Sequence, residues 1–274
     1  MWMAWQELTS KKPWAPELSL SVKNRVKSFG YKLLATFLLS ATLACSGQNI
    51  HFDVPDNTSQ IILVTSDNWD TSHATLSRLE RTTDSWRQVG PDITVQLGRN
   101  GLGWGKGIHP KAKTGVEKKE GDGKAPSGIF LLGSAFGYAE QAPVNVSFDY
   151  RQADERDYYV DAVDSSDYNQ WRRIPEEQEN RPKSLWSSFE RMRREDLMYE
   201  FGLVVEHNKT PIQPGSGSAI FLHVWLNPET ATSGCTAMDK EDLLSLLRWL
   251  KTDSKPVLVQ MPTSALGAFS NYSN

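Results

Sequence analysis

The chain has 274 residues, of which 39% are hydrophobic, and its formal net charge is −3 at pH 7. This length and composition are sufficient for one sizeable domain with a hydrophobic core. The slightly negative charge excludes a strongly basic surface, so we expect no nucleic-acid partner.

The first 44 residues have the features of an export leader. Basic residues precede an apolar run at 33–43, which is too short for a conventional membrane-spanning helix. Cys45 directly follows Thr42-Leu43-Ala44, so we expect either lipidation of Cys45 or ordinary cleavage after Ala44. Residues 1–21 are long and Trp-rich for a leader, which favours a start at Val22. We therefore expect an exported, periplasmic protein whose only membrane contact is a lipid anchor at Cys45.

The rest of the chain predicts one domain that is mainly β. Residues 45–59 are polar and predict a tether, residues 60–265 the domain, and residues 266–274 a tail. Apolar and β-branched segments predict strands at 61–65, 93–97, 128–132, 203–206, 218–225 and 256–261, and helices at 187–199 and 240–250. Few long helices separate the strands, which argues against a doubly wound sheet.

Residues 138–186 are too long for a simple connection between strands. They carry many charges and few aliphatic side chains, which is typical of a solvated excursion. The alternative is a lid or substrate-binding insertion, because the segment also mixes aromatic and polar groups suited to a sugar-peptide polymer. We favour a position near the cleft, with Asp164 and Tyr168 contacting substrate.

His223 and Cys235 are the candidate catalytic residues. His223 lies in the apolar segment 219–225, which predicts a buried strand, and Cys235 follows twelve residues later on a loop, directly after Gly234. A free thiol has a pKa of about 8.5, so acyl chemistry at neutral pH needs a nearby imidazole. Gly234 allows close approach to a substrate carbonyl, and the neighbouring amides could form an oxyanion hole. Alternatively, the thiol is an inert buried group and His223 a core histidine.

The loop Thr232-Ser233-Gly234-Cys235-Thr236-Ala237-Met238 after a histidine resembles the L,D-transpeptidase catalytic domain family (YkuD type), whose members remodel bacterial peptidoglycan. Two further segments, 97–105 and 119–130, are similar to family segments, and together the pattern looks like a proteobacterial branch. The resemblance covers roughly residues 60–262. It implies a barrel-like β-sandwich with peripheral helices, Cys235 as nucleophile, His223 as base, and Gly234 supporting the oxyanion. Beside them, Ser233 and Thr236 would contact substrate.

Two positions depart from the better-known members. Ser233 stands where they have His before the Gly-Cys pair, and Ala237 stands where they have Arg or Asn two residues after the Cys. Both changes lie by the thiol, so they affect how the donor peptide is oriented and which acceptor is used.

The resemblance implies attack of the Cys235 thiolate on the L-to-D bond of a peptidoglycan tetrapeptide stem, giving a thioester. An amine acceptor makes the protein a transpeptidase, which we favour, whereas water makes it a carboxypeptidase or endopeptidase. A non-catalytic wall-binding lipoprotein is the third hypothesis. The remaining histidines show no zinc-ligand spacing with Cys235, so we expect no metal and no cofactor. We expect a monomer.

Overall fold

A computed structural model describes residues 52–112, 114–178 and 181–267. Within these ranges the chain forms fourteen strands, one α-helix and four short 3-10 helices. The strands are β1 (Gln60–Ser66), β2 (His73–Arg81), β3 (Trp86–Gln88), β4 (Ile93–Gln96), β5 (Leu102–Trp104), β6 (Ala125–Gly137), β7 (Tyr150–Gln152), β8 (Asp157–Val160), β9 (Gln170–Arg173), β10 (Phe189–Arg191), β11 (Phe201–Val205), β12 (Phe221–Val224), β13 (Thr236–Met238) and β14 (Val257–Pro262). The helix is α1 (Lys240–Trp249), and the 3-10 turns are η1 (Glu176–Gln178), η2 (Pro182–Ser184), η3 (Thr252–Ser254) and η4 (Thr263–Ala265).

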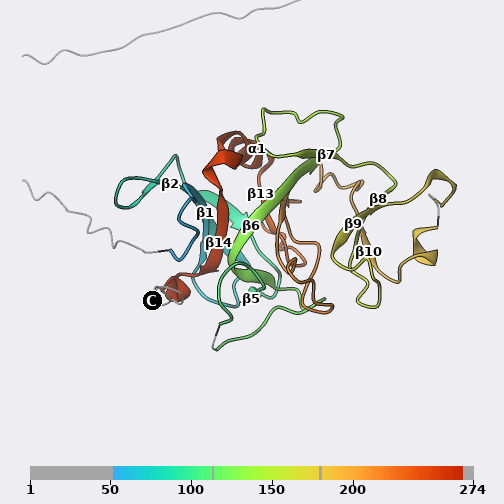
Figure 1. The fold of residues 1–274 in the computed structure, drawn as a ribbon, viewed down its shortest axis with the longest axis horizontal. Helices are drawn as coiled ribbons and strands as arrows, with labels where there is room; N and C mark the ends of the chain where they lie inside the picture. Colours follow the sequence, from blue (N-terminus) through green and yellow to red (C-terminus); the bar gives the residue numbers. More distant parts are fainter. Residues whose placement is uncertain (1–51, 113, 179–180, 268–274) are drawn as a thin grey trace, which may run out of the picture. The chain divides into compact units, whose positions relative to one another are not determined.

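The larger sheet closes on itself as a barrel. Its strands follow the order β1-β14-β6-β11-β12-β13-β4-β2, and β1 also pairs with β2, which completes the ring (Figure 1). Beyond the ring, β3 pairs with β2, and β5 and β7 each pair with β6. The mainly β, barrel-like fold expected from the sequence is confirmed. Closure leaves the ring strands without free edges, so a side chain on β12 or β13 is held by neighbours on both sides.

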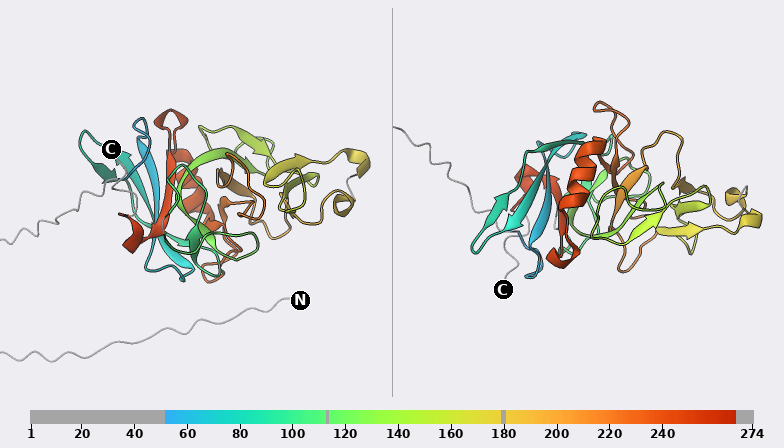
Figure 2. Two further views of the ribbon diagram at one scale, coloured as in Figure 1. Left: turned by 60° about the horizontal axis from the view of Figure 1, so that its bottom comes forward. Right: turned by 90° about the horizontal axis from the view of Figure 1, so that it is seen from above.

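Apolar side chains of the ring and of α1 form one core. Ile62, Leu76, Leu203 and Leu222 are fully buried in the same cluster as the leucine stripe of the helix. The stripe is Leu243, Leu246, Leu247 and Leu250, the spacing that places apolar groups on one helix face. Asp239 caps the helix by accepting a hydrogen bond from the Glu241 amide at 2.8 Å. Figure 2 shows α1 beside the barrel strands.

The long segment between β7 and β11 forms a second, three-stranded sheet in the order β10-β8-β9. Its centre is the buried carboxylate of Asp157, which accepts hydrogen bonds from Arg173 Nη1 at 2.7 Å and Trp171 Nε1 at 2.8 Å. Tyr159 packs edge-on against Phe221 of β12, with ring centroids 5.1 Å apart. The inserted sheet is therefore packed against the strand that carries His223.

All six predicted strands overlap observed strands, and the predicted helix at 240–250 is confirmed by α1. The predicted helix at 187–199 is wrong. Its first residues form β10, which pairs with β8, and the basic residues that follow pair with acidic groups: Arg193 with Glu155 at 2.9 Å and Arg194 with Asp196 at 2.6 Å. The pairing of β10 with β8 and of Arg193 with Glu155 joins this segment to distant residues, and these contacts outweigh its weak helical preference.

The described part of the expected tether, residues 52–59, contacts the domain. Phe52 is buried and packs edge-on against Trp86, with ring centroids 6.2 Å apart. The expected leader and Cys45 lie outside the described residues. Across the ranges that are described, no helix is both long and apolar enough to span a bilayer.

Candidate active site

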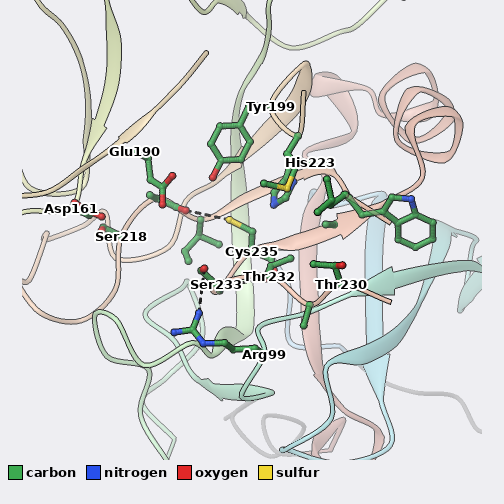
Figure 3. A pocket seen from close by; sticks show the side chains of 18 of the residues that line it. Arg99, Asp161, Glu190, Tyr199, Ser218, His223, Thr230, Thr232, Ser233 and Cys235 are labelled. Atoms are coloured by element: carbon green, nitrogen blue, oxygen red, sulfur yellow. Dashed lines mark hydrogen bonds between the residues drawn. The ribbon is translucent and has the colours of Figure 1, made fainter. Parts of the chain in front are cut away.

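A cavity of about 380 Å³ lies between the barrel and the inserted sheet. Residues 230–235 and β12 supply one part of its lining, and the insertion between β7 and β11 supplies another. The polar and ionisable side chains of the lining include Arg99, Lys118, Asp161, Glu190, Arg194, Tyr199, His223, Ser233 and Cys235. Sequence segments that are far apart therefore meet around one thiol (Figure 3).

Strand pairing brings His223 and Cys235 to the same cavity. β12 and β13 are parallel neighbours in which His223 is paired with Ala237, and Cys235 directly precedes β13. Because side chains alternate along a strand, Cys235 and Ala237 share a face, and His223 lies on that face of the adjacent strand. Figure 3 shows the His223 ring and the Cys235 sulfur on the same side of the cavity.

The His223 ring is held in one orientation. Its Nδ1 is 2.8 Å from the carbonyl oxygen of Val224, so Nδ1 carries the hydrogen and Nε2 carries the lone pair. Tyr199 packs edge-on against the ring, with centroids 5.2 Å apart and planes at 78°. Burial lowers the pKa of His223 to about 4, so the imidazole is neutral at pH 7 and able to accept a proton at Nε2.

The Cys235 thiol is also neutral at rest. Burial raises its pKa to about 12, and the nearby Glu190 carboxylate acts in the same direction. The sulfur accepts a hydrogen bond from the Phe221 amide at 3.4 Å, and the thiol donates to the Ala219 carbonyl at 3.3 Å. A resting thiolate–imidazolium pair is therefore not favoured. The thiol must lose its proton before it can act as a nucleophile.

Ala219 has a φ of +52°, which is rare for a residue with a side chain. Its amide donates to Asn169 Oδ1 at 3.3 Å, and its carbonyl accepts from the thiol. Asn169 also donates to the carbonyls of His207 and Asn208 at 3.0 and 2.8 Å. The unusual backbone at Ala219 is thus held by a buried amide from the insertion, and it aims a carbonyl at the nucleophile.

The loop before Cys235 is fixed by its own hydroxyl groups. Thr232 Oγ1 donates to the Cys235 carbonyl at 2.7 Å and accepts from the Gly234 amide at 3.1 Å. A Cβ at Gly234 would lie 3.0 Å from the carbonyl oxygen of Lys124, which is tighter than ordinary contact. Ser233 Oγ accepts a hydrogen bond from Arg99 Nη1 at 3.3 Å. Ser233 and Gly234 both line the cavity with the thiol.

Three residues expected to contact substrate lie outside this lining. Thr236 is buried and donates to Gln260 Oε1 at 2.6 Å, on the opposite face of β13 from Cys235. Tyr168 is buried and donates to Glu120 Oε2 at 2.5 Å. Asp164 accepts from Ser187 Oγ at 3.0 Å. Tyr168 is connected to the cavity through its partner Glu120, which is one of the lining residues.

Sequence reasoning missed most of the charged lining. Glu190, Arg194 and Tyr199 fall in the segment predicted as a helix, so nothing indicated that they face the thiol. Arg99 lies in segment 97–105, which is similar to a family segment. That similarity could have indicated that Arg99 lies at the site. Burial raises the pKa of Glu190, and the neighbouring Asp161 adds to this effect.

No group of three His, Cys, Asp or Glu side chains in the described part of the chain is arranged to hold a metal ion. A thiol and a neutral imidazole line the same cavity, and the hydrogen bonds of the sulfur are to the Phe221 amide and the Ala219 carbonyl. Acyl transfer by a thiol nucleophile requires these two groups at one site.

A family profile described as "YkuD: L,D-transpeptidase catalytic domain" matches residues 92–259. No curated protein matches the chain. Among solved structures, Bd1075 of Bdellovibrio bacteriovorus is 14% identical, with a TM-score of 0.36 over 74% of this chain and 48% of that protein. The helical cell shape determining protein Pgp2 of Campylobacter jejuni is 14% identical, with a TM-score of 0.37 over 78% and 51%. The chain spans about half the length of these two proteins.

Proposed function

Because the chain belongs to the L,D-transpeptidase catalytic domain family, we propose that it is a peptidoglycan L,D-transpeptidase that works through Cys235 and His223. One observation carries this proposal: the thiol and an imidazole whose Nδ1 is held by the Val224 carbonyl lie on the same face of neighbouring, paired backbone segments and line one cavity. The substrate is a tetrapeptide stem, and the product is a bond between its penultimate carbonyl and an acceptor amine.

The proposed reaction begins from the neutral pair. His223 Nε2 takes the thiol proton as Cys235 Sγ attacks the carbonyl of the L-to-D bond. The imidazolium then gives the proton to the nitrogen of the departing terminal D-amino acid, leaving a thioester on Cys235. An acceptor amine attacks this thioester, its proton passes to Nε2, and the thiol forms again.

We assign supporting roles to the other expected residues. Gly234 and the amides near Cys235 would stabilise the oxyanion, and Ser233 would contact the donor peptide. Tyr168 and Thr236 would act from behind the lining, through Glu120 and Gln260 respectively. Asp164 would contact only a substrate that extends beyond the cavity.

The test is incubation of the full chain with tetrapeptide-stem muropeptides, followed by mass spectrometry. A dimer mass supports the transpeptidase. Loss of the terminal D-amino acid without dimer formation identifies a carboxypeptidase with the same Cys-His pair. Cys235→Ala should abolish either product, and Cys45→Ala, at the other cysteine of the chain, is the matched control that should retain it.

We further propose that residues 1–44 direct export and that Cys45 carries a lipid anchor, so that a monomeric domain works at the membrane face in the periplasm. The composition of the leader and the Cys that follows Ala44 support this.

A further inference from the structure

The cations that line the cavity differ in whether a carboxylate already holds them. Lys118 Nζ is 2.6 Å from Asp122 Oδ1, and Arg194 pairs with Asp196 at 2.6 Å and with Glu190 at 3.3 Å. Arg99 has no acidic side chain within ion-pair distance among the residues the structure describes; its observed side-chain partner is the neutral hydroxyl of Ser233. Among these three lining cations, Arg99 is therefore the one whose guanidinium N–H groups are not held by a carboxylate.

Arg99 is fixed relative to the nucleophile. Its amide donates to the Thr232 carbonyl at 2.8 Å, and Gly98 forms a parallel bridge with Thr232. Its guanidinium reaches Ser233, two residues before Cys235. In Figure 3 the Arg99 side chain lies below Cys235 and points toward Ser233. Backbone contacts thus hold Arg99 against the loop that precedes Cys235, and its exposed guanidinium lines the same cavity as the thiol.

The wall across the cavity carries two carboxyl groups, Glu190 and Asp161, and one guanidinium, Arg194, which is already paired with Glu190 and Asp196. Glu190 and Asp161 lie above and beside the thiol in Figure 3. Burial raises the pKa of both carboxyls, which shows that this wall is poorly solvated and disfavours further negative charge. A carboxylate that enters the cavity is repelled from this wall and attracted toward Arg99.

We propose that Arg99 binds the C-terminal carboxylate of the peptide whose last bond Cys235 attacks. This rests on the proposed function, in which the departing residue is a terminal D-amino acid with a free carboxylate. A guanidinium presents several donors in a rigid fork that matches a carboxylate. The methyl group of Ala237, on the face of β13 that carries Cys235, offers no donor. Arg99 therefore sets the direction in which the donor peptide lies across the thiol.

Binding is measured first, with turnover removed. Calorimetry on the Cys235→Ala chain compares a tetrapeptide stem with its C-terminal carboxamide. We expect the carboxylate form to bind about 10-fold or more tightly, and Arg99→Gln to erase that preference. Arg99→Lys should keep part of it. The matched control is Arg87→Gln, because Arg87 is exposed on β3 and pairs only with Glu80 among the described contacts.

Each of three results overturns the proposal. The first is equal binding of the two peptides, and the second is no binding of either. The third is a preference for the carboxylate that survives in an Arg99→Gln chain whose thermal unfolding is unchanged. Turnover is measured separately in chains that retain Cys235. There, Arg99→Gln should raise KM for the carboxylate substrate about 10-fold and leave KM for the amide unchanged. Selective, Arg99-dependent binding without any turnover would refute the transpeptidase and leave the carboxylate site standing.

Discussion

The raised pKa of Cys235 makes a quantitative prediction about its reactivity. In a Cys45→Ala chain, Cys235 is the one remaining thiol. With a pKa of about 12, a fraction of about 10⁻⁴ of Cys235 is ionised at pH 8, whereas about a quarter of a free cysteine with a pKa of about 8.5 is ionised. Alkylation by iodoacetamide at pH 8 should therefore be about 10³-fold slower than for a small model thiol, because the thiolate is the reacting species.

Burial also restricts access to the sulfur, so the dependence on pH is the decisive measurement. Restricted access lowers the rate by the same factor at every pH, whereas a raised pKa gives a rate that climbs about tenfold per pH unit through pH 10. Glu190→Gln should speed alkylation at every pH in this range, since the Glu190 carboxylate opposes ionisation of the thiol. Asp164→Asn is the matched control, because Asp164 belongs to the same insertion but does not line the cavity.

A rate that levels off between pH 6 and 9 would refute this reasoning. It would mean that Cys235 exists as a thiolate at rest, stabilised by an imidazolium, and that the neutral starting state of the proposed reaction is wrong. The same result in His223→Ala would place the stabilising group elsewhere.

Three further predictions concern the nucleophile, acid stability and anchoring. Cys235→Ser should lose nearly all turnover, because a hydroxyl with a pKa far above 7 gains much less from His223; an active serine variant, by the mass assay, would contradict the mechanism. Burial lowers the folded-state pKa of His207 to about 3 and of His223 to about 4, from 6.5, so the unfolded chain takes up protons first as the pH falls below 6.5. Urea unfolding at pH 5 should therefore give a free energy of unfolding about 4 kcal/mol below that at pH 7.5, and His207→Gln should remove about half of this difference. A free energy of unfolding that does not change between these pH values would show that the two imidazoles are not buried in the neutral form. Cys45→Ala should move the protein from membranes to the soluble periplasmic fraction without changing its activity on muropeptides, and a variant that stays with membranes would rule out a lipid anchor at Cys45.

The sequence predicted the strands that are apolar on both faces and the helix with a clear stripe. β1 and β14 have continuous hydrophobic runs, and α1 has its cap at Asp239 and leucines at helical spacing. β2 was missed because its apolar inward positions, Ala74 and Leu76, are followed at the same alternation by the charged residues Arg78 and Glu80, so the pattern holds over only part of its length. Such a strand becomes recognisable only with its partners, since pairing with β1 and β4 determines which side is buried.

The candidate nucleophile and base could be read from a local motif because both lie near one another in the chain. The opposite wall could not, because it depends on the fold of the insertion. Asp161 and Glu190 are 29 residues apart and meet only because β8 and β10 pair in the smaller sheet. Composition pointed to Asp164 in this insertion, whereas the acidic residue that lines the cavity is Asp161.

Two different sheets line the cavity. The residues of the proposed chemistry and the residues of the opposite wall can therefore change independently. The strands that carry His223 and Cys235 belong to a closed ring, whereas Glu190, Arg194 and Tyr199 belong to, or follow, a sheet inserted between two ring strands. Under the proposed function, exchanging the inserted segment between relatives would therefore alter which peptides are accepted while His223 and Cys235 stay in place. Sequence differences among homologues should accumulate in the insertion wherever the peptides of the bacterial cell wall differ. A mutant library confined to residues 188–199 is therefore the smallest one that could change the selectivity for peptides.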